Sequence, residues 1–406
     1  MENKITKIMA SEVNDSRGNP TLKVTVYIGD ISASFSVPSG ASTGIHEAHE
    51  LRDADGKGVK NAIENINTII ANALINQNIF NQAEIDRIMI DLDGTTNKDI
   101  LGGNSTIGVS IACAKLAAKI SNKEVYEYLS TLKEIKSSRN VPYLYMNLIN
   151  GGKHAKNNLA FQEYHIVPEA DSVEEAISMG IKIVHSLEKI IRKNCGDDSV
   201  ILGDEGGYAP IVNNIREPLL YLNEAIQENN FPSKVHIALD VASSSFYKDG
   251  KYYIDGKDIS KEELLELYGT LINEFNIFSI EDPFNEEDFA SFRKLKDTYS
   301  DLFVMGDDLT VTNKHILQKA IDSKCINAMI IKPNQIGTLS ETLDTMKLAR
   351  DNDIELIVSH RSGETDDDFI ADLVYAFGCF GLKSGAPEKS ERKVKYDRLK
   401  LISNMK

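Results

Sequence analysis

The sequence predicts an α/β protein with two parts, an N-terminal α+β domain over residues 1–135 and a (β/α)8-type barrel over residues 136–406. The chain has 406 residues, and a barrel of this type takes about 250 residues, so a second domain fits beside it. Beyond residue 140, short apolar runs recur, each followed by charged residues or glycine and then by helical periodicity. Apolar residues make up 42% of the chain, which is enough to bury a sizeable core.

The first part mixes strand and helix patterns. Residues 21–29 and 32–38 alternate apolar and polar side chains around a short connection, which predicts a β-hairpin. Apolar residues recur at helical spacing over residues 57–74 and 105–121. A polar stretch over residues 130–140 then precedes the next apolar run, and we place the domain boundary there.

The second part repeats one unit of strand and helix. The apolar runs and the residues that follow them are SVILGDEGG, KVHIALDVASS, IFSIEDPF, LFVMGDDLTVT, AMIIKPNQIG, IELIVSHRSGE and FGLKSGAP. Their first key polar residues are Asp204 or Glu205, Asp240, Glu281, Asp307, Lys332, His360 and Lys383. From Glu205 onward these residues lie 23 to 41 positions apart, about one βα unit each. Apolar strands that alternate with helices predict a parallel sheet covered by helices.

The polar strand ends distinguish a barrel from an open sheet. A barrel gathers all its carboxyl strand ends around one axis, whereas an open sheet gathers only the strands near its switch point. Seven charged ends that serve one site therefore favour the barrel.

Composition excludes several classes of function. The formal net charge of −16 argues against a sequence-independent nucleic-acid binder, and any anionic substrate needs cations gathered locally. The four cysteines are widely spaced and include no CxxC pair, which predicts free thiols in a reducing compartment. The N-terminus has no apolar segment of signal-peptide length, and no run approaches the ~20 apolar residues of a membrane span. We expect a cytoplasmic protein.

Three carboxylates, Asp240, Glu281 and Asp307, end three successive runs. Clustered carboxylates need protons or a cation, and oxygen ligands without Cys or His favour Mg²⁺. The alternative is that each acid caps or begins the helix that follows it.

Two further residues have side chains suited to proton transfer. Lys332 ends a buried run, where nearby cations would lower its pKa and make it a general base; the alternative is a lysine that extends to the rim. Glu205 lies among glycines and could act as a general acid if neighbouring acids such as Glu163 raise its pKa.

Cationic groups that an anionic substrate requires come late in the chain. Arg361 offers a planar guanidinium and Lys383 an ammonium, and Ser362 adds a hydroxyl beside His360. Residues 39–44, SGASTG, form a small-residue loop suited to a lid or a simple turn, and no Gly-Lys-Ser/Thr follows to make it a P-loop. His154 is equally consistent with a structural and a catalytic role.

Taken in order, these motifs closely resemble the enolase family. They extend from residue 15 to about residue 392 and are DSRGNPT, PSGASTG, NGGKHA, the pair Gln162–Glu163, GDEGG, SIEDPF, DDLTVTN, KPNQIGT, SHRSGET and KSGAP. One such motif means little, whereas the ordered set is highly specific.

The resemblance implies an enolase-type barrel whose first units are irregular, and a reaction that interconverts 2-phosphoglycerate and phosphoenolpyruvate. It implies two Mg²⁺ ions, the first on Asp240, Glu281 and Asp307 and the second arriving with substrate and contacted by Ser42. Lys332 would remove the C2 proton, and Glu205, with Glu163 nearby, would protonate the departing hydroxyl. The implied substrate-binding groups are Arg361 and Ser362 for phosphate, Lys383 for carboxylate, and His154, Gln162 and His360 along the pocket.

The sequence departs from the family pattern at three places. The chain stops at Lys406 where relatives usually continue, Ser245 replaces a common acid, and His165 stands where Met is more usual. Two alternatives therefore stay open: a paralogue that acts on a phosphonate analogue, and a non-catalytic binding protein on the same scaffold. The resemblance also implies a homodimer, with an octamer as the larger alternative.

Overall fold

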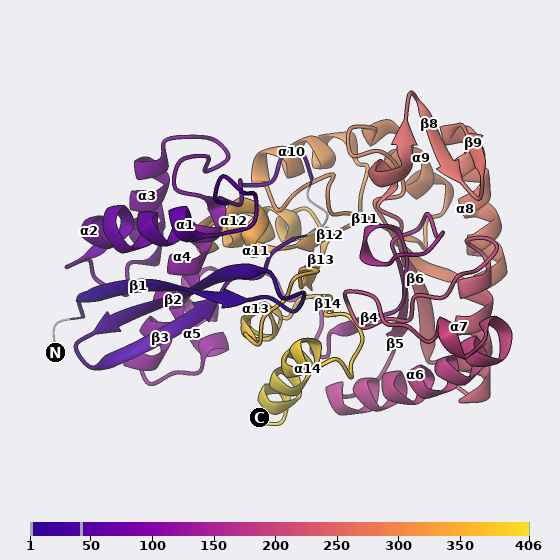
Figure 1. Ribbon diagram of the computed structural model, residues 1–406, viewed down its shortest axis with the longest axis horizontal. Coiled ribbons are helices and arrows are strands. Elements are labelled where there is room, and N and C mark those ends of the chain that lie inside the picture. Colours follow the sequence, from indigo (N-terminus) through magenta and orange to yellow (C-terminus); the bar gives the residue numbers. More distant parts are fainter. Residues whose placement is uncertain (1–2, 41–43, 406) are drawn as a thin grey trace.

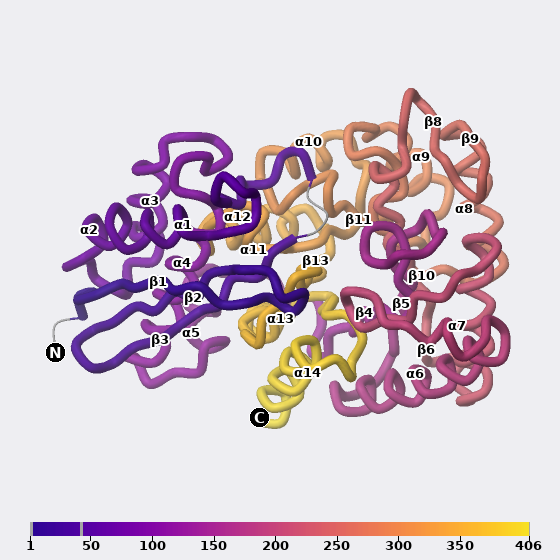
Figure 2. The backbone as a smooth tube through the Cα atoms, viewed as in Figure 1, coloured from indigo at the N-terminus to yellow at the C-terminus, as the bar shows by residue number. Residues whose placement is uncertain are grey.

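We analysed a computed structural model of the chain, which describes residues 3–40 and 44–405. It consists of an N-terminal α+β module beside a closed barrel, and the last helix packs back against the barrel near the module (Figure 1). The tube view follows the same path from the indigo module to the yellow C-terminal helix (Figure 2). Ser42 and its neighbours at positions 41 and 43, half of the predicted small-residue loop, lie outside the described residues.

The N-terminal module contains a three-stranded antiparallel sheet covered by helices. Its strands are β1 (Lys7–Asn14), β2 (Pro20–Ile28) and β3 (Ile31–Ser36). Its helices are α1 (Lys60–Asn65), which continues through a π-helical turn (Ile66–Ile70) into α2 (Ala71–Leu74), then α3 (Gln82–Asp93), α4 (Gly103–Ile120) and α5 (Val125–Leu132). The predicted hairpin and both predicted helices are confirmed.

Eight strands close the barrel in the order β10-β11-β12-β13-β14-β4-β5-β6. They are β4 (Tyr143–Asn150), β5 (Glu163–Pro168), β6 (Val235–Asp240), β10 (Ile277–Glu281), β11 (Phe303–Gly306), β12 (Ala328–Ile331), β13 (Glu355–Ser359) and β14 (Gly381–Lys383). The first units are irregular, as the resemblance implied: β5 is antiparallel to both β4 and β6, whereas the other neighbouring strands of the barrel are parallel. A direct connection reverses the chain between β4 and β5, because no crossover helix separates them.

The predicted strand in SVILGDEGG is wrong. Residues 199–207 contribute only isolated bridges at Leu202, and they form the connection that carries Glu205. Three glycines, Gly203, Gly206 and Gly207, interrupt the run, and Gly206 has a φ of 86°, a conformation that favours glycine.

Helices surround the barrel, and a small sheet extends from it. The helices of eight or more residues are α6 (Val173–Cys195), α7 (Glu217–Glu228), α8 (Lys261–Phe275), α9 (Phe289–Thr298), α10 (Lys314–Ser323), α12 (Leu339–Asp351), α13 (Phe369–Phe377) and α14 (Ser390–Ser403). The short elements are α11 (Pro333–Ile336) and the sheet of β7 (Tyr247–Lys248), β8 (Lys251–Ile254) and β9 (Lys257–Ile259).

Helix α4 joins the two parts of the molecule. Fifteen of its residues are buried, because the sheet covers one side and α11 of the barrel contacts another. A helix buried on nearly all sides needs small and apolar residues, which GNSTIGVSIACAKLAAKI supplies. The module is thereby held beside the carboxyl end of the barrel.

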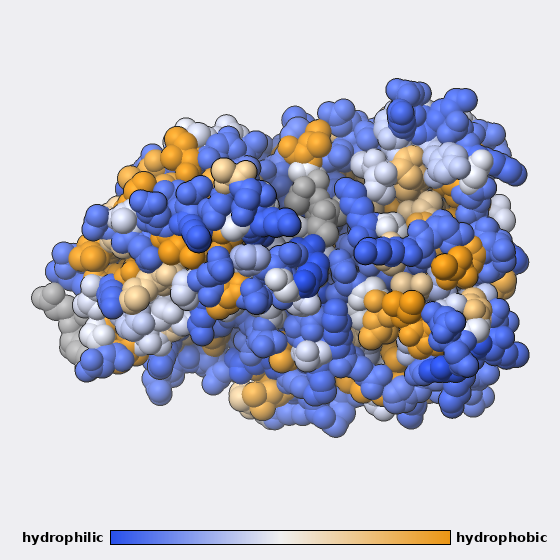
Figure 3. All heavy atoms as spheres, in the orientation of Figure 1, coloured by the Kyte–Doolittle hydropathy of each residue, from blue (hydrophilic) through white to orange (hydrophobic). Residues whose placement is uncertain are grey.

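The visible surface is mainly polar, with apolar side chains in separate small groups (Figure 3). Among the described residues, no helix is long and apolar enough to cross a membrane. The four cysteines are unpaired thiols, three of them buried.

Candidate active site

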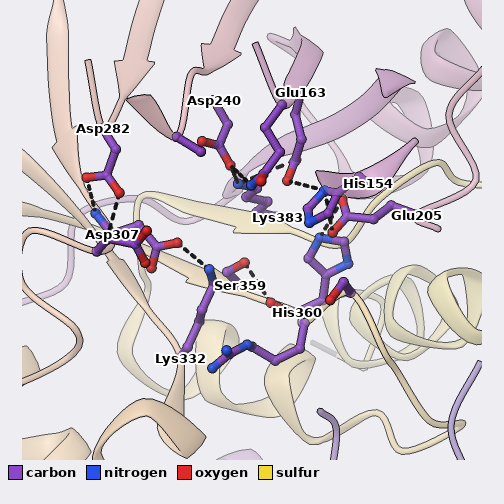
Figure 4. Close-up of a pocket in the computed structure, with 15 residues that line it drawn as sticks. His154, Glu163, Glu205, Asp240, Asp282, Asp307, Lys332, Ser359, His360 and Lys383 are labelled. Carbon is purple, nitrogen blue, oxygen red and sulfur yellow. Dashed lines mark hydrogen bonds and ion pairs between the residues drawn. The ribbon is translucent and has the colours of Figure 1, made fainter. Parts of the chain in front are cut away.

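A polar cavity lies at the carboxyl end of the barrel, where the predicted strand ends meet (Figure 4). The residues that line it are His154, Gln162, Glu163, Glu205, Asp240, Ala242, Asp282, Asp307, Asp308, Lys332, Ser359, His360, Arg361, Ser362 and Lys383. Every described residue that we predicted for the site is among them except Glu281, which lies beside Lys383.

The reversal of β5 brings Glu163 to this end of the barrel. Glu163 is the first residue of β5, and it is paired in register with Asp240, the last residue of β6. Asp240 is in turn paired with Glu281, the last residue of the parallel strand β10. Three carboxylates from neighbouring strands therefore lie in one row.

Lys383, the last residue of β14, lies among these three acids. Its Nζ donates to Asp240 Oδ2 at 2.8 Å and to Glu281 Oε2 at 2.8 Å, and it lies 3.4 Å from Glu163 Oε2. Burial lowers the pKa of Lys383, but the neighbouring carboxylates outweigh it and raise that pKa well above its usual value. Burial and repulsion within the row raise the pKa of Glu281.

Asp307 forms a second ionic contact, with Lys332. The Lys332 ammonium donates to Asp307 Oδ2, and both side chains are largely buried. Burial alone would lower the pKa of Lys332, but Asp307 raises it overall. Asp307 thus holds the ammonium charged in this structure, and the lowered pKa that we expected from nearby cations stays a prediction.

Asp282 is a site residue that our sequence analysis missed. Its carboxylate accepts the backbone N–H of Asp307 at 3.0 Å and of Asp308 at 2.7 Å, so it fixes the turn that carries Asp307. Burial and the neighbouring acids raise the pKa of Asp308 to about 8. The doublets Glu281–Asp282 and Asp307–Asp308 were the available signal, because two adjacent acids can divide ligand and supporting roles.

The donor set fits a hard divalent cation. Asp240, Glu281 and Asp307 are buried oxygen donors, and the lysine contacts show that positive charge is favourable between them. Gln162 Oε1 is buried without a hydrogen-bond partner among the described residues, while its Nε2 lies 3.5 Å from Asp240 Oδ2. Among the described residues, two other groups have carboxylate or imidazole atoms that all lie within 4.8 Å of one another: Asp282–Asp307–Asp308 and His154–Glu163–Glu205.

The helix-cap alternative for the three acids is wrong. The N-caps of the helices that follow their strands are Ser260 for α8, Asp288 for α9 and Asn313 for α10. The carboxylates of Asp240 and Asp307 point instead toward the cavity (Figure 4).

Histidines surround the second pair of acids, Glu163 and Glu205. His154 Nδ1 lies 3.2 Å from Glu163 Oε1 and 3.5 Å from Glu205 Oε1, and His165 Nε2 lies 2.7 Å from Glu163 Oε2. Burial lowers the pKa of His154, but both glutamates outweigh it and raise that pKa. His165 contacts Glu163 from the barrel interior, where it is fully buried.

The expected raised pKa of Glu205 is wrong for this structure. Burial and Glu163 do raise it, but His360 and His154 outweigh them, and the pKa lies below its usual value. Asn147 also donates to Glu205 Oε2 at 3.0 Å. Residue types alone could not predict this direction, because it depends on which histidine rings and N–H donors the fold brings to the carboxylate.

His360 and Arg361 lie on the other side of Glu205. His360 Nε2 is 3.1 Å from Glu205 Oε2, and burial lowers the pKa of His360 to about 4. Arg361 Nη1 donates to Glu47 Oε2 at 2.9 Å, so an acid of the N-terminal module contacts the predicted phosphate-binding arginine. Ser245, one of the departures, is exposed and is not among the residues that line the cavity.

Comparisons with known proteins agree with this geometry. Residues 5–129 match the family model of the enolase N-terminal domain, and residues 138–405 match that of the enolase C-terminal TIM barrel domain. An enolase of Methanocaldococcus jannaschii is 48% identical over 98% of this chain and 94% of its own length. Enolases of Methanosarcina barkeri and Nitratiruptor are 47% and 46% identical over 98% and 97% of the chain, and 94% and 95% of their own lengths.

Proposed function

The chain belongs to the enolase family, and on that premise we propose that it catalyses the reversible dehydration of 2-phosphoglycerate to phosphoenolpyruvate in glycolysis and gluconeogenesis. The observation that supports this most is the arrangement of one cavity. A largely buried lysine, Lys332, lies on one side of a row of carboxylates, and a buried glutamate, Glu205, lies on the other (Figure 4). Such a site can remove a proton and donate one on opposite sides of a small substrate.

Lys332 is the base in this proposal. It removes the C2 proton as a neutral amine, so the Lys332 ammonium must first lose its proton, which its contact with Asp307 now disfavours. Lys383 lies where its ammonium can bind the substrate carboxylate. Two Mg²⁺ ions, when bound, would offset the carboxylates and stabilise the negative charge that develops on the substrate. Asp240, Glu281 and Asp307 would hold the first ion, and Ser42 would contact the second.

Glu205 is the acid. It donates a proton to the departing C3 hydroxyl, and in the reverse direction the resulting carboxylate accepts a proton from water. Glu163 lies on the far side of His154 from Glu205. Once substrate displaces water, repulsion between the buried carboxylates of Glu163 and Glu205 favours a proton shared between them. His154 lies between both acids and can orient them.

The phosphate of the substrate would bind Arg361 and Ser362, with His360 and Gln162 along the wall of the cavity. Arg361 offers two parallel donors to a phosphate, so the contact that it makes with Glu47 would be weakened or shared when substrate arrives. This exchange would couple substrate binding to the N-terminal module.

We further propose a cytoplasmic homodimer, with an octamer as the larger alternative, and a domain division between residues 135 and 136. Sedimentation at assay concentration tests the assembly: a dimer or octamer agrees with the proposal, and a stable monomer contradicts it.

The experiment is an assay of product formation from 2-phosphoglycerate, followed by the ultraviolet absorbance of the enol phosphate. Product is expected with Mg²⁺, and none after treatment with EDTA. A phosphonate analogue is expected to react more slowly than 2-phosphoglycerate. Folded, magnesium-loaded protein that forms no product from 2-phosphoglycerate would contradict the proposal.

A further inference from the structure

Arg392, on the inner side of α14, is a fully buried arginine close to the acid side of the cavity. Its Nη1 donates to His360 Nδ1 at 2.6 Å and to the carbonyl oxygen of Arg361 at 2.6 Å. Its Nη2 donates to the carbonyl oxygens of Ser362 at 2.7 Å and Asp204 at 3.1 Å. One guanidinium thus contacts the segment before Glu205 and the segment that carries the predicted phosphate ligands.

The contact with His360 determines which ring nitrogen carries a proton. A guanidinium has donors only, so His360 Nδ1 must accept and is unprotonated. In the neutral imidazole the proton is then on Nε2, which lies 3.1 Å from Glu205 Oε2. The Nε2–H therefore faces the acid at contact distance, although the geometry there is not that of a hydrogen bond.

We propose that Arg392 is a positioning residue of the acid half-reaction, because it fixes the Nε2–H tautomer of His360 and keeps His360 neutral beside Glu205. This inference rests on the proposed function, in which Glu205 transfers the proton to the C3 hydroxyl. It adds a residue of the last helix, which does not line the cavity, to the groups that control the acid.

The surroundings of His360 show why its protonation state matters. The charged groups that act on it are Glu205, Glu163 and Arg392, of which the two acids favour protonation of the ring and Arg392 opposes it. A doubly protonated His360 would place a cation against Glu205 and hold that carboxylate ionised more strongly, which makes it a poorer acid. Burial and Arg392 together keep the ring neutral over the physiological range.

The first test uses wild-type protein labelled with ¹⁵N-histidine and no substrate. Long-range ¹H–¹⁵N spectra report the tautomer of each histidine, and His360→Gln assigns the signal of interest by its loss. The proposal predicts an Nε2–H tautomer that persists down to at least about pH 5.5, well above the value of about 4 for this ring. An Nδ1–H tautomer, or a ring that becomes charged near pH 6.5, would overturn it.

The second test compares Arg392→Met with Lys389→Met. Lys389 Nζ donates to the same Asp204 carbonyl at 2.7 Å but does not contact His360, so it is a matched control on the edge of α14. In Arg392→Met, burial still lowers the pKa of His360 but the repulsion from Arg392 is gone, so His360 is expected to gain its proton at a higher pH than in wild type, and kcat to fall about tenfold across that step. Wild type and Lys389→Met should show neither change.

The outcomes separate this proposal from the proposed function. If wild type forms no enol phosphate, the proposed reaction is wrong, but the NMR spectra still determine the tautomer of His360, because they need no substrate. If Arg392→Met folds and neither the His360 signal nor the pH profile of kcat changes, the positioning role is wrong. Should Arg392→Met fail to fold, Arg392→Lys is the second variant. It keeps the charge but replaces the planar guanidinium by an ammonium, which cannot reach all four acceptors in the same geometry, so the His360 signal is expected to change. An unchanged signal in that variant contradicts the proposal.

Discussion

The histidine between Glu163 and Glu205 illustrates how single residues determine the charge of this cavity. His154 gains more from the two carboxylates than it loses through burial, so its folded pKa lies above the unfolded value of about 6.5. A protonated His154 therefore stabilises the fold fully below about pH 6.5, and this contribution is lost as the pH rises through the raised folded pKa.

We predict that His154→Gln lowers the free energy of unfolding by about 1–2 kcal/mol near pH 6 and by less near pH 9. Urea denaturation of the metal-free protein, followed by circular dichroism at both pH values, measures the difference. The control is His185→Gln, whose side chain is 57% exposed on α6. A loss that is equal at both pH values for His154→Gln would contradict the assigned protonation.

The sequence predicted which residues line the cavity better than it predicted the pKa values of their side chains. The types of Lys332, Glu205 and His360 were sufficient to predict the cavity that they line, because each follows an apolar run. The raised pKa that an acid role for Glu205 requires is not seen, since this pKa depends on partners that only the fold brings close. Arg392 was missed because nothing in its local pattern separates it from the other basic residues of a terminal helix.

At the scale of elements, the turn after β11 shows how a strand end becomes a binding site. Asp282 accepts two backbone N–H groups there and so fixes the direction of Asp307. Supporting contacts of this kind control metal affinity without touching the metal. Asp282 therefore positions the predicted ligand Asp307 through the backbone of the turn.

We predict that Asp282→Asn weakens Mg²⁺ binding by about 10- to 100-fold, because the amide keeps only one oxygen acceptor and turns a donor toward the backbone N–H groups. Titration calorimetry of substrate-free protein measures the affinity. Asp288→Asn, which alters the N-cap of α9, is the control and should leave Mg²⁺ affinity unchanged. Equal affinities for both variants would exclude the supporting role.

The strand pattern predicted most of the barrel but not its first units. Six charged strand ends from Asp240 onward follow apolar runs, and the runs around Asp240, Glu281, Asp307, Lys332, His360 and Lys383 all form barrel strands. The reversal at β5 was not predicted, because alternation of polar and apolar residues contains no information on strand direction. That reversal is what brings Glu163 into the row with Asp240.

At the scale of the whole molecule, the N-terminal module is tied to the barrel around the cavity. Ser39 and Gly363 exchange two backbone hydrogen bonds of 2.8 and 2.9 Å, and Arg361 contacts Glu47. Farther from the site, Asp86 of α3 accepts from the backbone N–H of Ser340 at 2.9 Å and from its Oγ at 2.6 Å. The start of α12 is thereby held by an acid of the other part of the chain.

We predict that Asp86→Ala lowers the free energy of unfolding by about 2–4 kcal/mol, because it leaves the part-buried N–H and hydroxyl of Ser340 without their acceptor and removes one of the acceptors of Gln82 Nε2. Urea denaturation followed by circular dichroism measures the loss. Asp91 lies on the same helix with a 63% exposed side chain, and Asp91→Ala should change stability by less than about 1 kcal/mol. Similar losses for both variants would contradict this role at the interface.

The most direct test of the central claim, that Lys332 and Glu205 divide two proton transfers, is exchange of the C2 proton of 2-phosphoglycerate with deuterated solvent. Proton NMR follows this exchange with Mg²⁺ present. We expect wild type both to exchange the proton and to form product. Glu205→Gln should still exchange the proton but form product much more slowly than wild type, and Lys332→Ala should do neither. Exchange that persists in folded Lys332→Ala would contradict the account. So would a Glu205→Gln variant in which exchange is lost together with product formation.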